Sequence, residues 1–185
     1  MGTNTHNNYL FKALDAYPYN LEETMEALNY ALSYHPESTE ALYLKAQVYA
    51  FQLYDYEAAK ECFEAVLGIK IDMPKVYPDY LYVLINNEDY EAAQKLLEFA
   101  LTVKATDKAV LRLLQGQLME RRNLLKPSLA AYKLARKKGG NTRFVNFVND
   151  EITRVKNKIS SKNKKKKKKK KSKKKGVKKN RSNKK

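Results

Sequence analysis

The residue types that most often perform covalent chemistry are scarce in this chain. It has one cysteine, Cys62, and two histidines, His6 and His35. A nucleophile needs a base within hydrogen-bonding reach, and a protein metal site needs three or four suitable ligands. His6 lies near the N-terminus and His35 lies beside Pro36, so these residues assemble neither a triad nor a convincing metal site. We therefore expect no enzymatic activity, no metal and no cofactor.

The acidic residues recur regularly instead of forming a catalytic pair. Glu22, Glu57 and Glu91 stand 34 or 35 residues apart, each near the start of an expected helix. Acids in a first helical turn favour the helix dipole while remaining solvated. Cys62 is next to the apolar Phe63 and is interpreted as a small helix residue.

A run of cations is the most distinctive chemical feature. From Lys156 to the end the chain has 19 Lys and Arg residues and no acid. Mutual repulsion and the lack of apolar groups predict a disordered tail over residues 160–185. The expected polyanion-binding residues are the eight consecutive lysines Lys164, Lys165, Lys166, Lys167, Lys168, Lys169, Lys170 and Lys171.

The ligand of this tail has several alternatives. A polycation binds nucleic acid through counterion release and without reading sequence, so RNA, ribosomal RNA in particular, is the first candidate. An anionic membrane ranks lower because neither aromatic anchors nor a lipidation motif lie nearby. The run also suits a nuclear localisation signal or a solubilising extension without a dedicated partner. No aromatic residue is interleaved with the lysines, so base stacking is not expected.

Charge is also polarised within the rest of the chain. Residues 1–107 hold 7 basic and 17 acidic groups, whereas residues 108–155 hold 11 basic and 3 acidic groups. Such asymmetry bears on partners and association rates and not on the fold.

An internal repeat indicates which elements carry these side chains. Residues 21–32, 56–67 and 90–101 are similar to one another at spacings of 35 and 34 residues, and a weaker copy begins at Leu125. Their apolar and small residues fall on one helical stripe, which predicts the second helix of a hairpin in each copy. First helices are expected upstream, over residues 39–49, 75–84 and 108–118. Asp55 and the Asn and Asp residues of 86–89 are predicted to cap the helices that follow.

This pattern resembles the tetratricopeptide repeat. The matching residues are Ala46 and Tyr49, then Asp55, Tyr56, Ala59 and Phe63, then Asp89, Tyr90, Ala93, Leu97 and Ala100, with Pro36 closing the first copy. Leu42, Tyr77 and Leu111 stand where the family has a bulky Trp. Small residues at helix crossings allow close approach.

The sequence therefore predicts an all-α solenoid. We expect repeats over residues 5–38, 39–73, 74–107 and 108–141; the alternative is an irregular helical bundle. Residues 142–159 are predicted to form a capping helix whose apolar stripe comprises Phe144, Phe147, Val148, Ile152, Val155 and Ile159. A partner-binding helix is the alternative for this segment.

The resemblance implies a concave groove, lined by first helices, that binds a peptide or a partner helix. By register, its expected residues are Tyr43, Gln47, Ala50, Asp79, Tyr82, Asn86, Arg112 and Gly116. The family's carboxylate clamp for chaperone tails lacks its two Asn and most of its cations here, so binding of such tails is not expected.

These observations predict a protein-binding or peptide-binding scaffold whose tail attracts acidic partners. The alternative is an RNA-associated or ribosome-associated protein in which the tail is the main binding element. The first 30 residues lack a signal-peptide pattern and no apolar stretch is long enough to span a bilayer, so a cytoplasmic location is expected, or a nuclear one in a eukaryotic cell. The partner's identity and the oligomeric state remain open.

Overall fold

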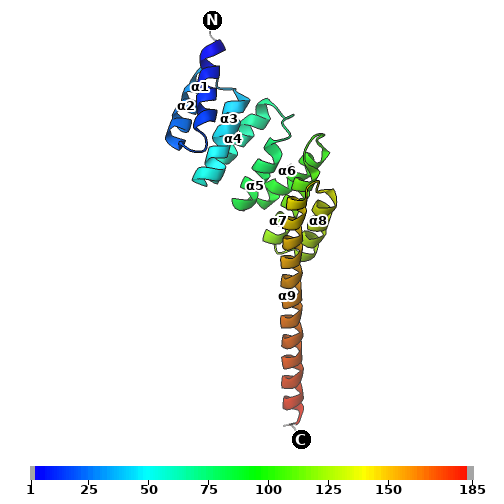
Figure 1. The fold of residues 1–185 in the computed structure, drawn as a ribbon. Helices are drawn as coiled ribbons and strands as arrows, with labels where there is room; N and C mark the ends of the chain where they lie inside the picture. The colour runs from blue at the N-terminus through cyan, green and yellow to red at the C-terminus, as the bar shows by residue number, and fades with distance from the viewer. Residues whose placement is uncertain (1–2, 183–185) are drawn as a thin grey trace.

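A computed structural model describes the backbone of residues 3–182 and the side chains of residues 8–164. This part of the chain forms helices and turns without any strand. Four hairpins are formed by α1 (Thr3–Ala16) with α2 (Leu21–Tyr34), α3 (Thr39–Val48) and η1 (Tyr49–Leu53) with α4 (Tyr56–Ile69), α5 (Val76–Asn86) with α6 (Tyr90–Thr102), and α7 (Lys108–Arg121) with α8 (Leu125–Lys138). The hairpins stack in chain order, and α9 (Thr142–Ser182) runs away from the last of them (Figure 1). The predicted all-α solenoid is confirmed.

Polar side chains begin many of the helices. Asn20, Ser38, Asp55 and Asp107 each accept a hydrogen bond from a backbone amide two or three residues further on. Asn141 likewise accepts one from the backbone amide at position 144, at 2.8 Å. These bonds satisfy amides that the first helical turn leaves unpaired. The expected cap at Asp55 is confirmed.

The Asp89 side chain does not cap α6 as expected, and it forms an ion pair instead. Its Oδ2 accepts hydrogen bonds from Lys60 Nζ at 2.7 Å and from Asn87 Nδ2 at 2.8 Å. The bond from Lys60 and then that from Asn87 lower the pKa of Asp89. Since Lys60 belongs to α4, this ion pair joins one repeat to the turn of the next.

Three clusters of buried apolar residues support the stacked arrangement. The largest extends from α3 to α7, a second joins the first hairpin to α3, and a third lies between α8 and α9. Ala46, Ala59, Ala93 and Ala100 are fully buried in the large cluster. Repeats that share a core in this way stabilise one another through neighbour contacts.

Two glycines permit close approach between elements. A Cβ on Gly116 of α7 would lie 2.4 Å from the Tyr132 ring of α8. A Cβ on Gly139 would lie 2.7 Å from Phe144. Gly139 is the C-cap of α8, and its φ of −65° is not left-handed, so a glycine is needed there for space and not for backbone conformation.

The first part of α9 covers the last hairpin. Val148, Ile152 and Val155 are buried against α8, and Ile159 is half-buried beside them. Phe147, which was expected on the same apolar stripe, is exposed instead, so the buried side of this segment is narrower than predicted. That residues 142–159 serve as a capping helix stays a prediction.

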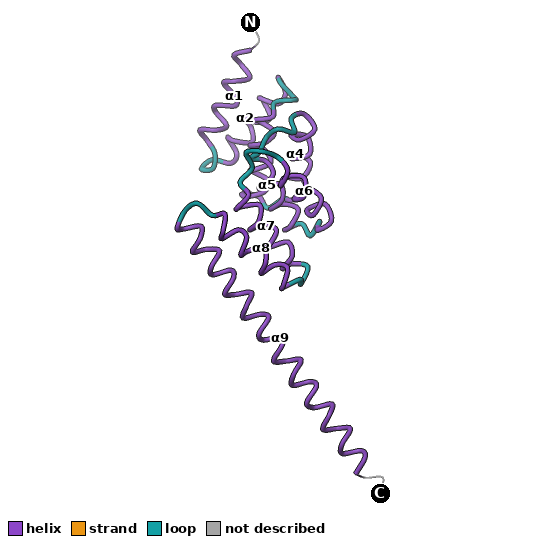
Figure 2. Tube along the Cα trace, turned by 90° about the vertical axis from the view of Figure 1, so that its right-hand side faces the viewer, coloured by secondary structure: helices purple, strands orange, loops and turns teal. Residues whose placement is uncertain are grey.

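The helix does not stop where the capping segment was expected to end. Its backbone continues to Ser182, and both views show it projecting beyond the hairpins (Figures 1 and 2). The disordered state expected for residues 160–185 stays a prediction. Lysine has a high helix propensity and the segment contains no proline, whereas repulsion between neighbouring lysines opposes a helix. The projecting residues extend about 35 Å at 1.5 Å per residue.

Candidate partner-binding site

Equivalent side chains of successive first helices line up at a spacing of 35 residues. We call them the inner series; they comprise Gln47, Tyr82 and Gln117, and Phe51, Asn86 and Arg121. The Phe51 and Tyr82 rings lie 5.3 Å apart between centroids. Arg121 Nη2 donates to Asn86 Oδ1 at 3.3 Å. These contacts join Phe51 of η1 to α5, and Asn86 of α5 to α7.

A π-helical turn determines which residue of the second repeat joins this face. Residues Tyr49–Leu53 form the turn, and Tyr54 follows with a left-handed φ of 55°. Such a turn absorbs an extra residue within a helix. As a result Ala50 is fully buried, whereas the half-buried Phe51 contacts Tyr82.

Asp79 joins the second and third repeats through hydrogen bonds. Its Oδ2 accepts from the Tyr43 hydroxyl at 2.7 Å and from Gln47 Nε2 at 3.1 Å. Lys75 Nζ lies 4.6 Å from the centroid of the Tyr43 ring. Burial, and then the bond to Asp79, raises the pKa of Tyr43, which keeps its proton for donation. The carboxylate is therefore already occupied by internal donors.

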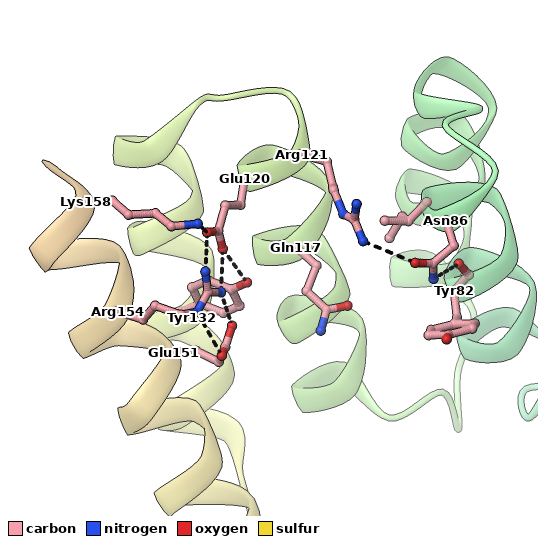
Figure 3. A pocket seen from close by; sticks show the side chains of 10 residues that line it. Tyr82, Asn86, Gln117, Glu120, Arg121, Tyr132, Glu151, Arg154 and Lys158 are labelled. Atoms are coloured by element: carbon pink, nitrogen blue, oxygen red, sulfur yellow. Dashed lines mark hydrogen bonds and ion pairs between the residues drawn. The ribbon is translucent and has the colours of Figure 1, made fainter. Parts of the chain in front are cut away.

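A cavity of about 600 Å³ opens between α5, α7 and α9. Its lining is mixed polar and aromatic and comprises Tyr82, Ile85, Asn86, Gln117, Glu120, Arg121, Tyr132, Glu151, Arg154 and Lys158. Figure 3 shows the two sides: α9 presents Glu151, Arg154 and Lys158, while α5 presents Tyr82 and Asn86. A volume of this order accommodates a small ligand or a few side chains of a partner.

Glu120 organises the α9 side of this cavity. Arg154 donates through both terminal nitrogens to its two oxygens, Lys158 Nζ donates at 2.7 Å, and the Tyr132 hydroxyl donates at 3.2 Å. Arg154 also pairs with Glu151 on its own helix. Burial alone raises the pKa of Glu120, but the hydrogen bonds from Arg154 and Lys158 outweigh it and lower the pKa to about 2. The carboxylate thus stays ionised and ties α7, α8 and α9 together.

Arg121 and Gln117 make fewer hydrogen bonds within the protein than Glu120 and Arg154 do. Among the side chains that the structure describes, Arg121 has only the amide of Asn86 as hydrogen-bond partner and no carboxylate. Gln117 Nε2 and Oε1 make no hydrogen bond within residues 8–164, and Figure 3 shows the Gln117 side chain between Arg121 and Tyr132. Both can meet a ligand without first breaking an internal ion pair.

The structure separates the eight residues expected in the groove into three groups. Tyr82 and Asn86 line the cavity. Tyr43, Gln47 and Asp79 meet in the internal hydrogen-bond cluster just described. Ala50, Gly116 and Arg112 make other contacts: the first two are buried, and Arg112 Nη1 donates to Gln115 at 2.7 Å while its Nε is buried without a partner.

The sequence analysis did not single out most of the cavity lining. Gln117 and Arg121 lie 35 residues beyond Tyr82 and Asn86, so a constant repeat length would have found them in place of Gly116 and Arg112. Glu151, Arg154 and Lys158 were not among the expected site residues. Their place in the cavity depends on the angle at which α9 packs, which residue types do not encode.

The lysine run is described only in part. Lys164 is exposed on α9. The side chains of Lys165 to Lys171 lie outside the described residues, although the helical backbone there is described.

Within the described residues, the remaining features give no sign of a metal site or a membrane-spanning helix. No cluster of three His, Cys, Asp or Glu side chains in this part of the chain is placed to bind a metal ion. None of its described helices has both the length and the apolar character needed to cross a bilayer.

The fold is that of the tetratricopeptide-type helical repeat proteins. The chain superposes on residues 41 to the end of MamA from Desulfovibrio magneticus RS-1 with a TM-score of 0.68 and 19% identity, over 87% of this chain and 94% of that one. The MamA RS-1 ArsTM double mutant gives a TM-score of 0.68 and 18% identity, over 86% and 93% of the two chains. PilW, a type IV pilus biogenesis factor, gives 0.63 and 14%, over 82% and 78%. No protein-family model and no curated protein sequence matches the chain.

Proposed function

We propose that this chain is a protein-binding scaffold that holds a segment of a partner against the inner series and in the adjoining cavity. The observation that carries the proposal is the open space of about 600 Å³ between three helices, lined by aromatic, amide and charged side chains. Repeat arrays bind through such extended inner surfaces. Tyr and Arg, both present in the cavity, are enriched among residues that dominate binding energy at interfaces.

The lysine-rich segment adds a second, electrostatic contact. With 19 basic residues and no acid after residue 155, it attracts acidic surfaces with strong salt dependence. Two weak contacts on one chain reinforce each other when both targets belong to the same assembly.

A photo-crosslinking experiment tests the scaffold function. A crosslinking amino acid is placed at Gln117, which lines the cavity, or at Glu98, which is exposed on α6. We expect position 117 to capture discrete proteins in cells, and in lysates at both roughly 100 mM and 500 mM salt, because close contacts resist screening. Position 98 should capture none of them. Equal labelling at both positions, or none at 117, would remove the support for the scaffold.

The alternative is an RNA-associated or ribosome-associated protein in which the lysine run is the main binding element. The charge of that run favours it. Replacing Lys164 to Lys171 by glutamine keeps good helix formers while removing eight charges. If all captured material is RNA or ribosomal and disappears in this variant, the lysine run carries the function and the repeats only support it.

A further inference from the structure

Not every charged side chain that lines the cavity is paired with an opposite charge. Among its lining residues there are three cations and two acids. Arg154 is paired with both Glu120 and Glu151, and Lys158 is paired with Glu120. Arg121, which is exposed, has only an amide oxygen as partner within the described side chains. One uncompensated positive charge therefore faces the open space.

The groups beside Arg121 suit a carboxylate-bearing chain. The guanidinium group presents paired N–H donors that match a carboxylate. Gln117 offers an amide that can bind either polar group of a peptide backbone, and Tyr82 offers an aromatic face. These three side chains come from two successive first helices, so an extended segment lying across them contacts both.

The charges outside the cavity determine along which helices such a segment can extend. The first 107 residues are strongly acidic, whereas the chain from residue 108 onward is basic. Beyond Lys158, the next turn of α9 carries Lys162, which lines a neighbouring hollow together with Asn157 and Ser161. An acidic segment is thus repelled by the early repeats and attracted from α7 along α9.

From this arrangement we infer that the partner segment bound in the cavity is an extended acidic peptide, with a Glu or Asp carboxylate on Arg121 and further acids running along the lysines of α9. The inference rests on the proposed scaffold function and specifies the chemical class of the partner. Bidentate pairing with Arg121 fixes one acid in place, while the lysines contribute screened attraction without fixed geometry.

The test uses fluorescence anisotropy with the full chain and a labelled peptide of alternating Glu and Ser, about 12 residues long, which spans roughly 40 Å when extended. The matched peptide carries Gln in place of Glu. Arg121→Gln removes the unpaired cation, and Arg122→Gln removes the same charge from the neighbouring exposed residue, which does not line the cavity. We expect about tenfold weaker binding of the acidic peptide by Arg121→Gln, because a hydrogen bond to a charged group is lost. Arg122→Gln should change binding by less than about twofold.

A duplex RNA of similar charge separates the two polyanion classes. Its binding should depend on Lys164 to Lys171 and remain the same in the two arginine variants. Equal effects of the two arginine variants on the acidic peptide, or equal binding of the Glu and Gln peptides, would overturn the inference. If the acidic peptide does not bind but crosslinking at Gln117 still captures proteins, the proposed scaffold function remains supported and only the acidic character of its partner is wrong.

Discussion

Arg154 of α9 and Glu120 of α7, 34 residues apart in sequence, form a two-bonded ion pair that holds the last helix against the array. Lys158 adds a third bond to the same carboxylate. An isolated exposed ion pair contributes little to stability, but a network with bidentate geometry contributes measurably.

Replacing Glu120 by alanine should therefore loosen α9. We expect the free energy of unfolding to fall by about 1–2 kcal/mol, since several charged hydrogen bonds are lost together. Urea denaturation measures this loss, and hydrogen exchange should show faster exchange in residues 148–159 than in α4. Glu61→Ala is the control, because Glu61 is exposed on α4. Equal losses in the two variants would show that Glu120 has no special role.

The same carboxylate predicts a pH dependence. Its folded-state pKa of about 2 is below the ordinary value of 4.5, so its stabilising contribution is fully present above about pH 4.5 and disappears as the pH falls through about 2. The difference in unfolding free energy between the wild-type chain and Glu120→Gln should thus shrink between pH 5 and pH 2. Unfolding curves at several pH values measure it. A difference that does not change with pH would contradict the assignment.

Gly116 should not tolerate a methyl group. Alanine at this position would place Cβ 2.4 Å from the buried Tyr132 ring, so either this ring or the two helices must shift. We expect a loss of about 1–3 kcal/mol in thermal or urea denaturation. Gly68→Ala, in α4, is the matched control, because a Cβ there would have nothing within 4 Å. The Gly68→Ala variant should be at least as stable as the wild-type chain, because alanine has a higher helix propensity than glycine.

Cys62 should react slowly in the folded protein. Its thiol is half-buried, and burial is the largest cause of its raised pKa. Since the thiolate is the reactive form, the rate of modification by a disulfide reagent at neutral pH should be about tenfold lower in the native chain than in denaturant. Equal rates would show an accessible, activated thiol and would reopen a redox function.

The hairpin architecture was predictable because the signals are local and repeated. Alanine at Ala59 and Ala93, with Phe63 and Leu97 four residues later, marks the same crossing in two copies. Each copy confirms the other, and the polar caps mark where the helices begin.

The inner face of the repeats and the cavity lining could be predicted only in part, for two physical reasons. A uniform α-helical register cannot foresee the π-helical turn at Tyr49–Leu53, which buries Ala50 and turns Phe51 to the inner face. The contribution of Arg154 and Lys158 depends on how α9 crosses α7 and α8, and this angle arises from many packing contacts. Tyr82 and Asn86, which were expected in the groove, lie in a regular helix and line the cavity.

The continuous helix of α9 also limits which parts of the molecule its C-terminal segment can reach. A flexible chain of the same 23 residues would average about 26 Å from end to end and could return to the body. A straight helix leaves the array at the end opposite the N-terminus (Figures 1 and 2). A straight helix therefore separates this segment from residues 1–107, which hold 17 acidic groups, whereas a flexible chain of the same length could approach them.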